Sequence, residues 1–432
     1  MLKQMVAPER VQLLNDSPAR AGAAYVLYWA QANRRVDFNH GLAFAVETAN
    51  RLRLPVLFAE GLNRERPFAS QRFDNFILDG VPDNASRAAH LGIGYEFSDA
   101  KGALYRWAER AAAIVTDDFP AYIVHGHNSR VPRKIGIPYY AVDSSCIVPM
   151  SCFTKQEYAA YTIRPKILRL LDEHLHPVEL EPVQQKWKAP LEPIPAVSST
   201  GGGRAAALKR LHDFLDHDLV RYAKYNREPS AHATSRLSSF LHFGHISALE
   251  IALAVRQRAA EEKLIVPEFL EQLIVRRELT FNFARYGPDP RTLAALPDWA
   301  QKSLAKHASD PREWSYTCSQ FEHAQTHDAL WNATQKELLR DGVIHGYYRM
   351  YWGKKIIEWS ATHQDALDTM IYLHDQYALD GRDPNTYTNI LWCFGLHDRP
   401  WTERPIFGMI RYMNLAGMRR KTNVDAYIRE MR

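Results

Sequence analysis

The sequence has few cysteines, no long apolar run and no apolar leader, and each absence removes a class of protein. Its four cysteines show no CxxC spacing, so we expect reduced thiols rather than a disulfide framework. No apolar run approaches a membrane span, and the first residues, MLKQMVAPER, lack the apolar core of a signal peptide. These absences predict a soluble cytoplasmic protein, or a nuclear one in a eukaryote, with no membrane partner.

Catalytic and metal patterns are missing as well. There is no convincing carboxylate pair for acid–base chemistry and no nucleophilic triad. His125 and His127, and likewise Glu173, His174 and His176, have spacings that a metal could use. No further cysteine or histidine completes either set, so we expect no metal site.

Two glycine patterns also fall short of nucleotide-binding motifs. No GxGxxG follows the first predicted strand, which argues against an ordinary dinucleotide-binding half. The cluster Gly201–Gly203 precedes a helical pattern but lacks the Gly-Lys-Ser/Thr ending of a phosphate loop. We interpret it as a flexible entry to a second domain.

Charge is nearly balanced, with 54 lysines and arginines against 49 aspartates and glutamates and a pI near 8.8. A mildly basic chain permits a nucleic-acid partner, but such a partner needs a local positive face rather than a large net charge.

Short apolar runs alternate with helical patterns in the first third of the chain. The strand-like runs are Ala24–Trp29, Leu54–Ala59, Ile93–Phe97, Ala112–Val115, Tyr122–Val124 and Ile137–Val142. Alternation of this kind predicts a Rossmann-like, doubly wound α/β domain with a parallel sheet over residues 20–175.

The rest of the chain reads differently. Residues 176–205 are rich in proline without clear periodicity, which predicts an interdomain connector laid across the surface. Strand patterns nearly vanish over residues 206–432, and helical spacing continues in Pro267–Leu279, Trp299–Lys306, Asp328–Leu339, Val343–Ser360 and Asp365–Ile371. Seven of the ten tryptophans lie here, so we expect a helical domain able to enclose a planar cofactor.

The stretch His345–Trp359 is the centre of this helical half. Trp352 and Trp359 lie two helical turns apart on one face, Arg349 lies one turn before Trp352, and Trp331 belongs to what reads as another helix. Spacing alone favours ordinary core packing of large apolar side chains.

Several sequence motifs in this half of the chain resemble those of a known family. RMYWGKKIIEW, DGRDPNTYTNILW, HDRPWTERPIFGMIRYMN, LHFGHIS and IVRREL closely resemble the class II cyclobutane pyrimidine dimer (CPD) photolyases, which are FAD-dependent, light-driven DNA-repair enzymes. The resemblance is dense from about Tyr222 to the C-terminus and thinner at YVLYWAQANRRVDFNHGLAFA. It implies UV-damaged DNA as the partner, FAD as the cofactor, a monomer, and in some members a second, light-harvesting antenna pigment whose identity here is unknown.

The resemblance assigns a set of residues to FAD. Arg349 and Asp380 pair beside the flavin ring. The segment Thr234–Ser238, which has small hydroxyl residues, cradles the diphosphate and ribityl chain. Small hydroxyl residues before a helix suit a diphosphate, although on their own they indicate an ordinary helix cap. The family usually has proline where Ser239 stands. The remaining assigned residues are Tyr222, Thr234, Ser235, Arg236, Leu237, Ser238, Arg277, Gly381 and Arg382.

Electron transfer and DNA contacts are implied in the same way. Tryptophans at the positions of Trp352, Trp331 and Trp359 pass an electron from the surface to the flavin. The lesion residues implied are Asn226, Arg227, Glu271, Met350 and Trp392. Cations for the phosphates are Arg404, Arg411, Arg419, Arg420 and Lys421, although charged residues near a C-terminus are often only a solvated face.

Two departures from the family pattern bear on activity. Asn226-Arg227-Glu228-Pro229 stands where Arg-Asn-Asp-Pro is usual, and His374 replaces the asparagine that faces N5 of the flavin. If His374 faces N5, we expect the flavin's redox behaviour to depend on pH in the range where histidine titrates, which for a free side chain is near about 6.5. The alternative is that His374 points away and another residue serves N5.

The sequence therefore predicts light-driven opening of the cyclobutane ring by an electron from excited, reduced FAD to a flipped-out dimer. Three alternatives stay open: a flavin photoreceptor without repair activity, repair of the (6-4) photoproduct, and a plain nucleic-acid-binding protein. His374 and the altered Asn226-Arg227 pair favour the photoreceptor slightly, and active-site histidine is typical of (6-4) repair.

Overall fold

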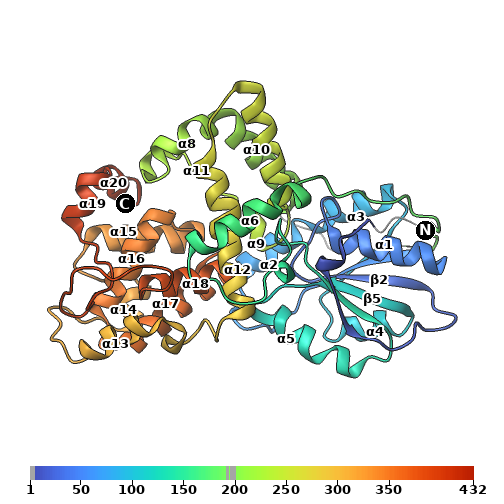
Figure 1. Cartoon of the computed structure of the whole chain (residues 1–432), viewed down its shortest axis with the longest axis horizontal. Helices are drawn as coiled ribbons and strands as arrows, with labels where there is room; N and C mark the ends of the chain where they lie inside the picture. Colours follow the sequence, from blue (N-terminus) through green and yellow to red (C-terminus); the bar gives the residue numbers. More distant parts are fainter. Residues whose placement is uncertain (1–4, 191–193, 195–200) are drawn as a thin grey trace. The chain divides into compact units, whose positions relative to one another are not determined.

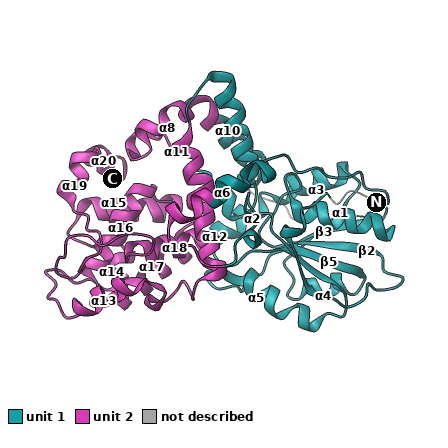
Figure 2. Ribbon diagram, viewed as in Figure 1, with its two compact units in different colours: residues 1–154, 166–212, 236–265 teal, residues 155–165, 213–235, 266–432 magenta. Residues whose placement is uncertain are grey.

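The computed structural model describes residues 5–190, 194 and 201–432 (Figure 1). Its contacts divide the chain into two compact units, which Figure 2 colours separately. Unit 1 comprises residues 1–154, 166–212 and 236–265, and unit 2 comprises residues 155–165, 213–235 and 266–432. The units interleave along the sequence, so neither coincides with a contiguous range such as 20–175 or 206–432.

Unit 1 is built on a six-stranded sheet with the order β1-β6-β5-β2-β3-β4. All neighbouring strands pair in parallel except β1, which is antiparallel to β6. The strands are β1 (Val11–Asn15), β2 (Tyr25–Ala30), β3 (Val56–Gly61), β4 (Gly94–Ser98), β5 (Ala111–Asp117) and β6 (Tyr139–Val142). The order reverses beside β2, as it does in a doubly wound sheet.

Helices cover both faces of this sheet (Figure 1). Helices α1 (His40–Leu52) and α3 (Val81–His90) lie on one face, and α4 (Ala103–Ala108) and α5 (Tyr122–Arg130) lie on the other. Every residue of β2 is buried, which explains why its sequence is a continuous apolar run rather than an alternating pattern. The other helices of this unit are α2 (Gln71–Leu78), α7 (Gly203–Asp213), α9 (Ser238–His242) and α10 (Ala248–Glu262), with α6 (Ala160–His174) divided between the units.

In unit 1, one predicted strand is a helix and one strand was not predicted. The run Tyr122–Val124 begins helix α5, because three apolar residues cannot distinguish a strand from a helix. The edge strand β1 was missed, since it is half exposed, with Leu13 at 49% exposure, and carries no buried run. It makes the sheet mixed rather than purely parallel.

The turn after β2, where a dinucleotide-binding fold has its glycine loop, is held by Asp117 at the end of β5. Its carboxylate accepts the backbone N–H groups of Gln31, Ala32 and Asn33 at 2.7–3.0 Å and the hydroxyl of Tyr28 at 2.8 Å. The turn after β2 is thus closed by a side chain of the protein itself, in agreement with the missing GxGxxG.

The glycines at 202 and 203 are packed, so their interpretation as a flexible entry was wrong. The Gly202 N–H donates to Asp79 and the Gly203 N–H donates to His245. A Cβ at Gly202 would lie 2.3 Å from the Phe76 carbonyl oxygen, and one at Gly203 would lie 2.6 Å from that of Asp79. Glycine is needed here because the backbones approach so closely. The predicted connector has no helix or strand through residue 190, and residues 191–193 and 195–200 lie outside the described part.

Unit 2 is helical, as predicted. A continuous helical run from Phe214 to Tyr225 ends in α8 (Leu219–Tyr225), and another runs from α11 (Pro267–Leu270) into α12 (Arg277–Tyr286). The remaining helices are α13 (Asp298–Lys306), α14 (Cys318–Glu322), α15 (Ala329–Asp341), α16 (Gly346–Trp359), α17 (His363–Tyr377), α18 (Pro384–Cys393), α19 (Leu415–Lys421) and α20 (Val424–Glu430).

Neither membrane nor metal features emerge from the described residues. No helix within the described ranges is long and apolar enough to span a bilayer. The same residues contain no group of three or more potential metal ligands, and the histidines at 125, 127, 174 and 176 join none.

Candidate functional site

Three buried indoles from α15 and α16 form a continuous path in unit 2. Trp331 lies between the other two: its ring centroid is 6.1 Å from that of Trp352, with the planes nearly parallel, and 6.4 Å from that of Trp359. The Trp331 Nε1–H donates to the Trp352 carbonyl at 3.0 Å, and the Trp352 Nε1–H donates to Gln335 at 2.9 Å. These bonds fix the indoles at separations short enough for an electron to move between them.

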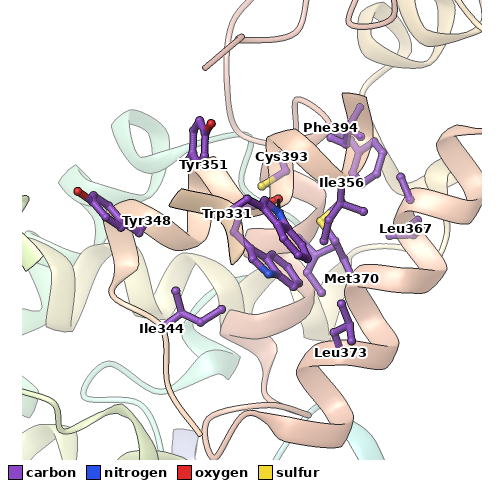
Figure 3. Close-up of a cluster of buried hydrophobic side chains, with 14 of the residues drawn as sticks. Trp331, Ile344, Tyr348, Tyr351, Ile356, Leu367, Met370, Leu373, Cys393 and Phe394 are labelled. Atoms are coloured by element: carbon purple, nitrogen blue, oxygen red, sulfur yellow. Dashed lines mark hydrogen bonds between the residues drawn. The ribbon is translucent and has the colours of Figure 1, made fainter. Parts of the chain in front are cut away.

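The surroundings of this path are apolar and tightly packed (Figure 3). Trp331 and Trp352 are fully buried, and Figure 3 shows Trp331 among side chains of α16 and α17, including Ile356, Met370 and Leu373. The three indoles are therefore part of the hydrophobic core of unit 2, and their role in electron transfer stays a prediction.

Arg349 and Asp380 form the predicted ion pair. Arg349 Nη2 lies 3.0 and 3.1 Å from the two carboxylate oxygens of Asp380. The side chains are 21% and 11% exposed, and the Thr386 hydroxyl donates to the Asp380 carbonyl. Arg349 Nε is a buried donor that has no hydrogen-bond partner among the described residues.

The unpaired Nε–H of Arg349 is the observation that shows whether these residues fit a flavin. A buried N–H without an acceptor is costly unless something outside the chain accepts its hydrogen. The ring system of a flavin carries carbonyl oxygens and ring nitrogens along its polar edge, so Arg349 fits it. His374 connects this place to the buried indoles. Its ring is in contact with Trp352, and the charge of Arg349 lowers its pKa.

Gly381 and Arg382 hold the loop that carries Asp380. A Cβ at Gly381 would lie 2.4 Å from the His374 carbonyl oxygen. The Arg382 guanidinium donates to the carbonyls of Asp375 and Ala378 at 2.6 and 3.2 Å, which closes the C-terminal end of α17. Both residues therefore act on the position of Asp380 within the protein.

His374 is fully buried, with its ring centroid 5.0 Å from that of Trp352. Its Nδ1–H donates to the Met370 carbonyl at 2.9 Å, so the neutral ring keeps its lone pair on Nε2. Burial, followed by the charge of Arg349, lowers the pKa of His374 to about 4. The pKa of the buried imidazole therefore lies below the free value of 6.5, so the ring is neutral at that pH. The dependence of the flavin's redox behaviour on His374 stays a prediction.

The residues of the predicted diphosphate cradle fall on both sides of the division between the units. Tyr222, Thr234 and Ser235 belong to unit 2, whereas the segment from Arg236 through Leu237 to Ser238 belongs to unit 1. Tyr222 stands edge-on to Phe214 and Phe269, and burial raises its pKa to about 12.

Helix α9 begins at Ser238, and Leu237 caps it without a side-chain hydrogen bond. Arg277 is buried in unit 2, with its guanidinium carbon 4.4 Å from the ring centre of Phe281. The assignment of all these residues to FAD stays a prediction.

The predicted lesion residues vary in how available they are. Trp392 is half-buried, with Lys354 Nζ 5.5 Å and the Arg411 guanidinium 5.3 Å from its ring centre, and Met350 is half-buried on α16. Asn226 donates to the Ala223 carbonyl, and Arg227 is exposed.

Glu271 accepts two hydrogen bonds from Arg164, at 2.7 and 3.0 Å, and one from Arg276 at 3.1 Å. Burial opposes its ionisation, but these arginines outweigh burial and lower the pKa of Glu271. A base contact from Glu271 would therefore come from a carboxylate already held by two cations.

Three of the five predicted phosphate cations line one cleft of about 280 Å³. Arg404, Arg420 and Lys421 line it together with aromatic and polar side chains, and none of the three forms an ion pair with a described residue. Arg411 is paired with Asp398 and Arg419 with Asp425. The aromatic and polar lining is Tyr347, Trp401, Thr402, Tyr412 and Asn414.

Lys354 and Gln335 were missed in the sequence. Lys354 is fully buried, donates to the Cys393 carbonyl at 2.6 Å, and burial lowers its pKa to about 8. Its one signal is its position in α16, two residues after Trp352. Gln335 had none, because its role depends on a neighbouring helix.

Comparison with known proteins identifies the family. No family model matches the chain. The deoxyribodipyrimidine photo-lyase of Methanothermobacter thermautotrophicus is 39% identical over 99% of both chains, and that of Arabidopsis thaliana is 36% identical over 98% of this chain and 92% of its own.

Two solved structures share the fold at low identity. A class III photolyase from Agrobacterium tumefaciens aligns with a TM-score of 0.69 at 17% identity, covering 96% of this chain and 87% of its own. A cryptochrome from Synechocystis sp. PCC6803 aligns with a TM-score of 0.70 at 15% identity, covering 95% and 89%. Together with identities of 34% to 39% to four photo-lyases over nearly its whole length, this shows that the chain belongs to the deoxyribodipyrimidine photo-lyase family.

Proposed function

We propose that this protein is a class II-type photolyase that uses light to split cyclobutane pyrimidine dimers in DNA, with FAD as its cofactor. The observation that carries the proposal is the full-length similarity to proteins named deoxyribodipyrimidine photo-lyase. The strings around Trp352 and Asp380 that resemble class II members support the finer assignment.

FAD, when bound in its reduced form, supplies the light-excited electron that opens the cyclobutane ring. Arg349 would hold the polar edge of the ring through its free Nε–H, and Asp380 fixes the guanidinium by accepting from Nη2. The pair keeps a cation at this place without leaving a buried charge uncompensated.

His374 would act beside N5 as a neutral hydrogen-bond acceptor. Its Nδ1–H is used by the Met370 carbonyl, so Nε2 has only a lone pair to offer. Such an acceptor suits a protonated ring nitrogen, whereas an asparagine amide can also donate. This chain would therefore favour the forms of its cofactor that carry a hydrogen at that edge.

The tryptophans would restore electrons to the cofactor site from the surface side. Along the path the order is Trp352, Trp331 and Trp359, because Trp331 lies next to each of the other two. All three indoles are buried, which limits side reactions of an oxidised indole with solvent.

Recognition of the lesion requires a base pair step to be opened, at a cost of a few kcal/mol that is smallest for a damaged, poorly stacked site. Trp392 and Met350 would form apolar walls for the extruded dimer, and Glu271 would contact a base. Arg404, Arg420 and Lys421 are the best phosphate contacts, since they are unpaired and share a cleft. No general acid or base is required.

The test is illumination of the chemically reduced protein with two oligonucleotides, one carrying a cyclobutane thymine dimer and one a (6-4) photoproduct. We expect thymine to be restored in the light from the first and not from the second, with no repair in the dark. Repair of the second alone would move the assignment to (6-4) lesions. Light-driven redox change without any repair would favour a photoreceptor.

A further inference from the structure

Beyond Trp359, an aromatic cluster continues to the protein surface. Trp359 is only 3% exposed, so an external donor cannot reach it directly. Its ring centroid lies 5.9 Å from that of Tyr316 and 4.7 Å from that of His327. His327 is exposed, and Trp314, which is 44% exposed, stacks on its imidazole at 4.3 Å.

The position of Tyr316 is fixed by the end of helix α16. Its backbone N–H donates to the Trp359 carbonyl at 2.9 Å. Arg312, four residues earlier, donates to the carbonyls of Ile357, Glu358 and Ala361 at 2.8–3.1 Å. The segment therefore closes the C-terminal turn of α16 and holds the phenol ring edge-on to the last indole.

The phenol of Tyr316 has a proton acceptor in place. The His327 backbone N–H donates to Tyr316 Oη at 3.0 Å, and Oη lies 2.8 Å from His327 Nδ1. Since Oη already accepts the backbone hydrogen, its own hydrogen points to Nδ1. A protonated imidazole would then lie against the face of Trp314, where a cation–π interaction stabilises it.

We propose that Tyr316 and His327 form the proton-coupled outer end of the electron route, an inference that rests on the proposed function because the cofactor must first oxidise Trp352. In this step the oxidised indole of Trp359 takes one electron from Tyr316. The phenolic proton moves from Oη to His327 Nδ1. Neutral Trp359, a neutral tyrosyl radical and an imidazolium result, so charge and electrons balance.

Charge and exposure both favour this outward step. Lys355 Nζ lies 5.4 Å from the ring centre of Trp359, so a second positive charge on that indole is disfavoured. Transfer to Tyr316 places the positive charge on His327, which is in contact with solvent and can release the proton there. A tyrosine is a good donor only when its proton has somewhere to go, and Tyr316 meets that condition at the surface.

Flash illumination of the flavin-bound protein, followed by transient absorption, tests the proposal. In the wild type we expect the indole radical to convert to a tyrosyl radical, more slowly in heavy water than in light water. Tyr316→Phe should reduce the tyrosyl yield by more than about tenfold while the indole radical still forms and lives longer. His327→Phe keeps a ring between the two indoles but removes the proton acceptor, and should slow the conversion.

Tyr412→Phe is the matched control, because the Tyr412 hydroxyl donates to Glu358 and its ring lies 5.1 Å from Lys355. We expect this variant to behave as the wild type. A tyrosyl radical that survives Tyr316→Phe, or that is lost only in Tyr412→Phe, would overturn the proposal.

A second measurement separates this proposal from the proposed function. Azide radicals generated by pulse radiolysis oxidise indoles in the dark, without excitation of the cofactor. A smaller tyrosyl yield in Tyr316→Phe than in the wild type supports the Tyr316–His327 end even if light produces no indole radical. Tyrosyl yields in Tyr316→Phe that equal those of the wild type, both in the dark and under flash, would refute it.

Discussion

Replacing His374 with asparagine should remove a defined part of the protein's sensitivity to acid. Burial and the charge of Arg349 lower the pKa of His374 to about 4, against 6.5 for a free histidine. As the pH falls from 6.5 towards 4, the unfolded chain binds a proton that the folded chain does not, so stability is lost in that window and not above it. At about 1.36 kcal/mol per pH unit, the loss is roughly 2 kcal/mol at pH 5 and about 3 kcal/mol below pH 4.

Urea unfolding at about pH 7.5 and about pH 5 measures this term. Tryptophan fluorescence reports mainly on unit 2, which contains seven of the ten tryptophans. The free energy of unfolding of His374→Asn, relative to the wild type, should rise by roughly 2 kcal/mol between the two pH values. His397→Asn is the matched control, because burial lowers the pKa of His397 to about 4 as well.

Both variants should show the same relief from acid, but only His374→Asn should shift the redox potential of the bound flavin. Between about pH 6 and pH 8 that potential should change with pH equally in the wild type and in His374→Asn. An unfolding difference that is the same at both pH values would refute a buried, neutral His374.

Three further predictions concern the ion pair, the indoles and the lesion wall. Arg349→Met and Asp380→Asn should each lower the free energy of unfolding by about 3 kcal/mol and release flavin, because each leaves one buried charge unpaired. The double variant should lose less than the sum of the two, since no charge is then unpaired. Additive losses in urea unfolding would contradict the ion pair. Trp352→Phe should keep flavin and repair by chemically reduced protein but slow photoreduction at least about a hundredfold; equal photoreduction rates would exclude this route. Trp392→Ala should weaken binding to dimer-bearing DNA by about 1–3 kcal/mol and spare undamaged DNA in the same titration; equal weakening of both would remove Trp392 from the pocket.

The buried elements of unit 1 were predictable because their physics is local. β2 and β5 are buried on both faces, so their sequences are apolar runs of strand length. β1 has no such run, because it is an exposed edge held by pairing with β6. Its existence depends on a partner more than 120 residues away, which periodicity does not register.

Only part of the candidate site in unit 2 could be predicted from the sequence, for a similar reason. The spacing of Trp352 and Trp359 on one helix is a local property, but the placement of Trp331 between them depends on how α15 packs on α16. The same holds for Gln335, and for Tyr316, which the fold of a loop brings to Trp359.

Environment, rather than identity, decides the behaviour of the titratable residues. The histidine at position 374 was identified as the departure that matters, yet its protonation follows from burial and from Arg349, neither of which a sequence gives quantitatively. Glu271 was expected to face a base, and two arginines hold it, one of them 107 residues away in the chain.

Light-driven repair of the dimer is measured most directly by counting the thymines restored per flash in a single turnover of the chemically reduced protein with dimer-bearing DNA. Restoration should require light, should stop when every protein-bound dimer has been split, and should persist in Trp352→Phe because the electron is already present. Restoration in the dark, or none in the light with flavin fully reduced and the dimer bound, would contradict light-driven repair.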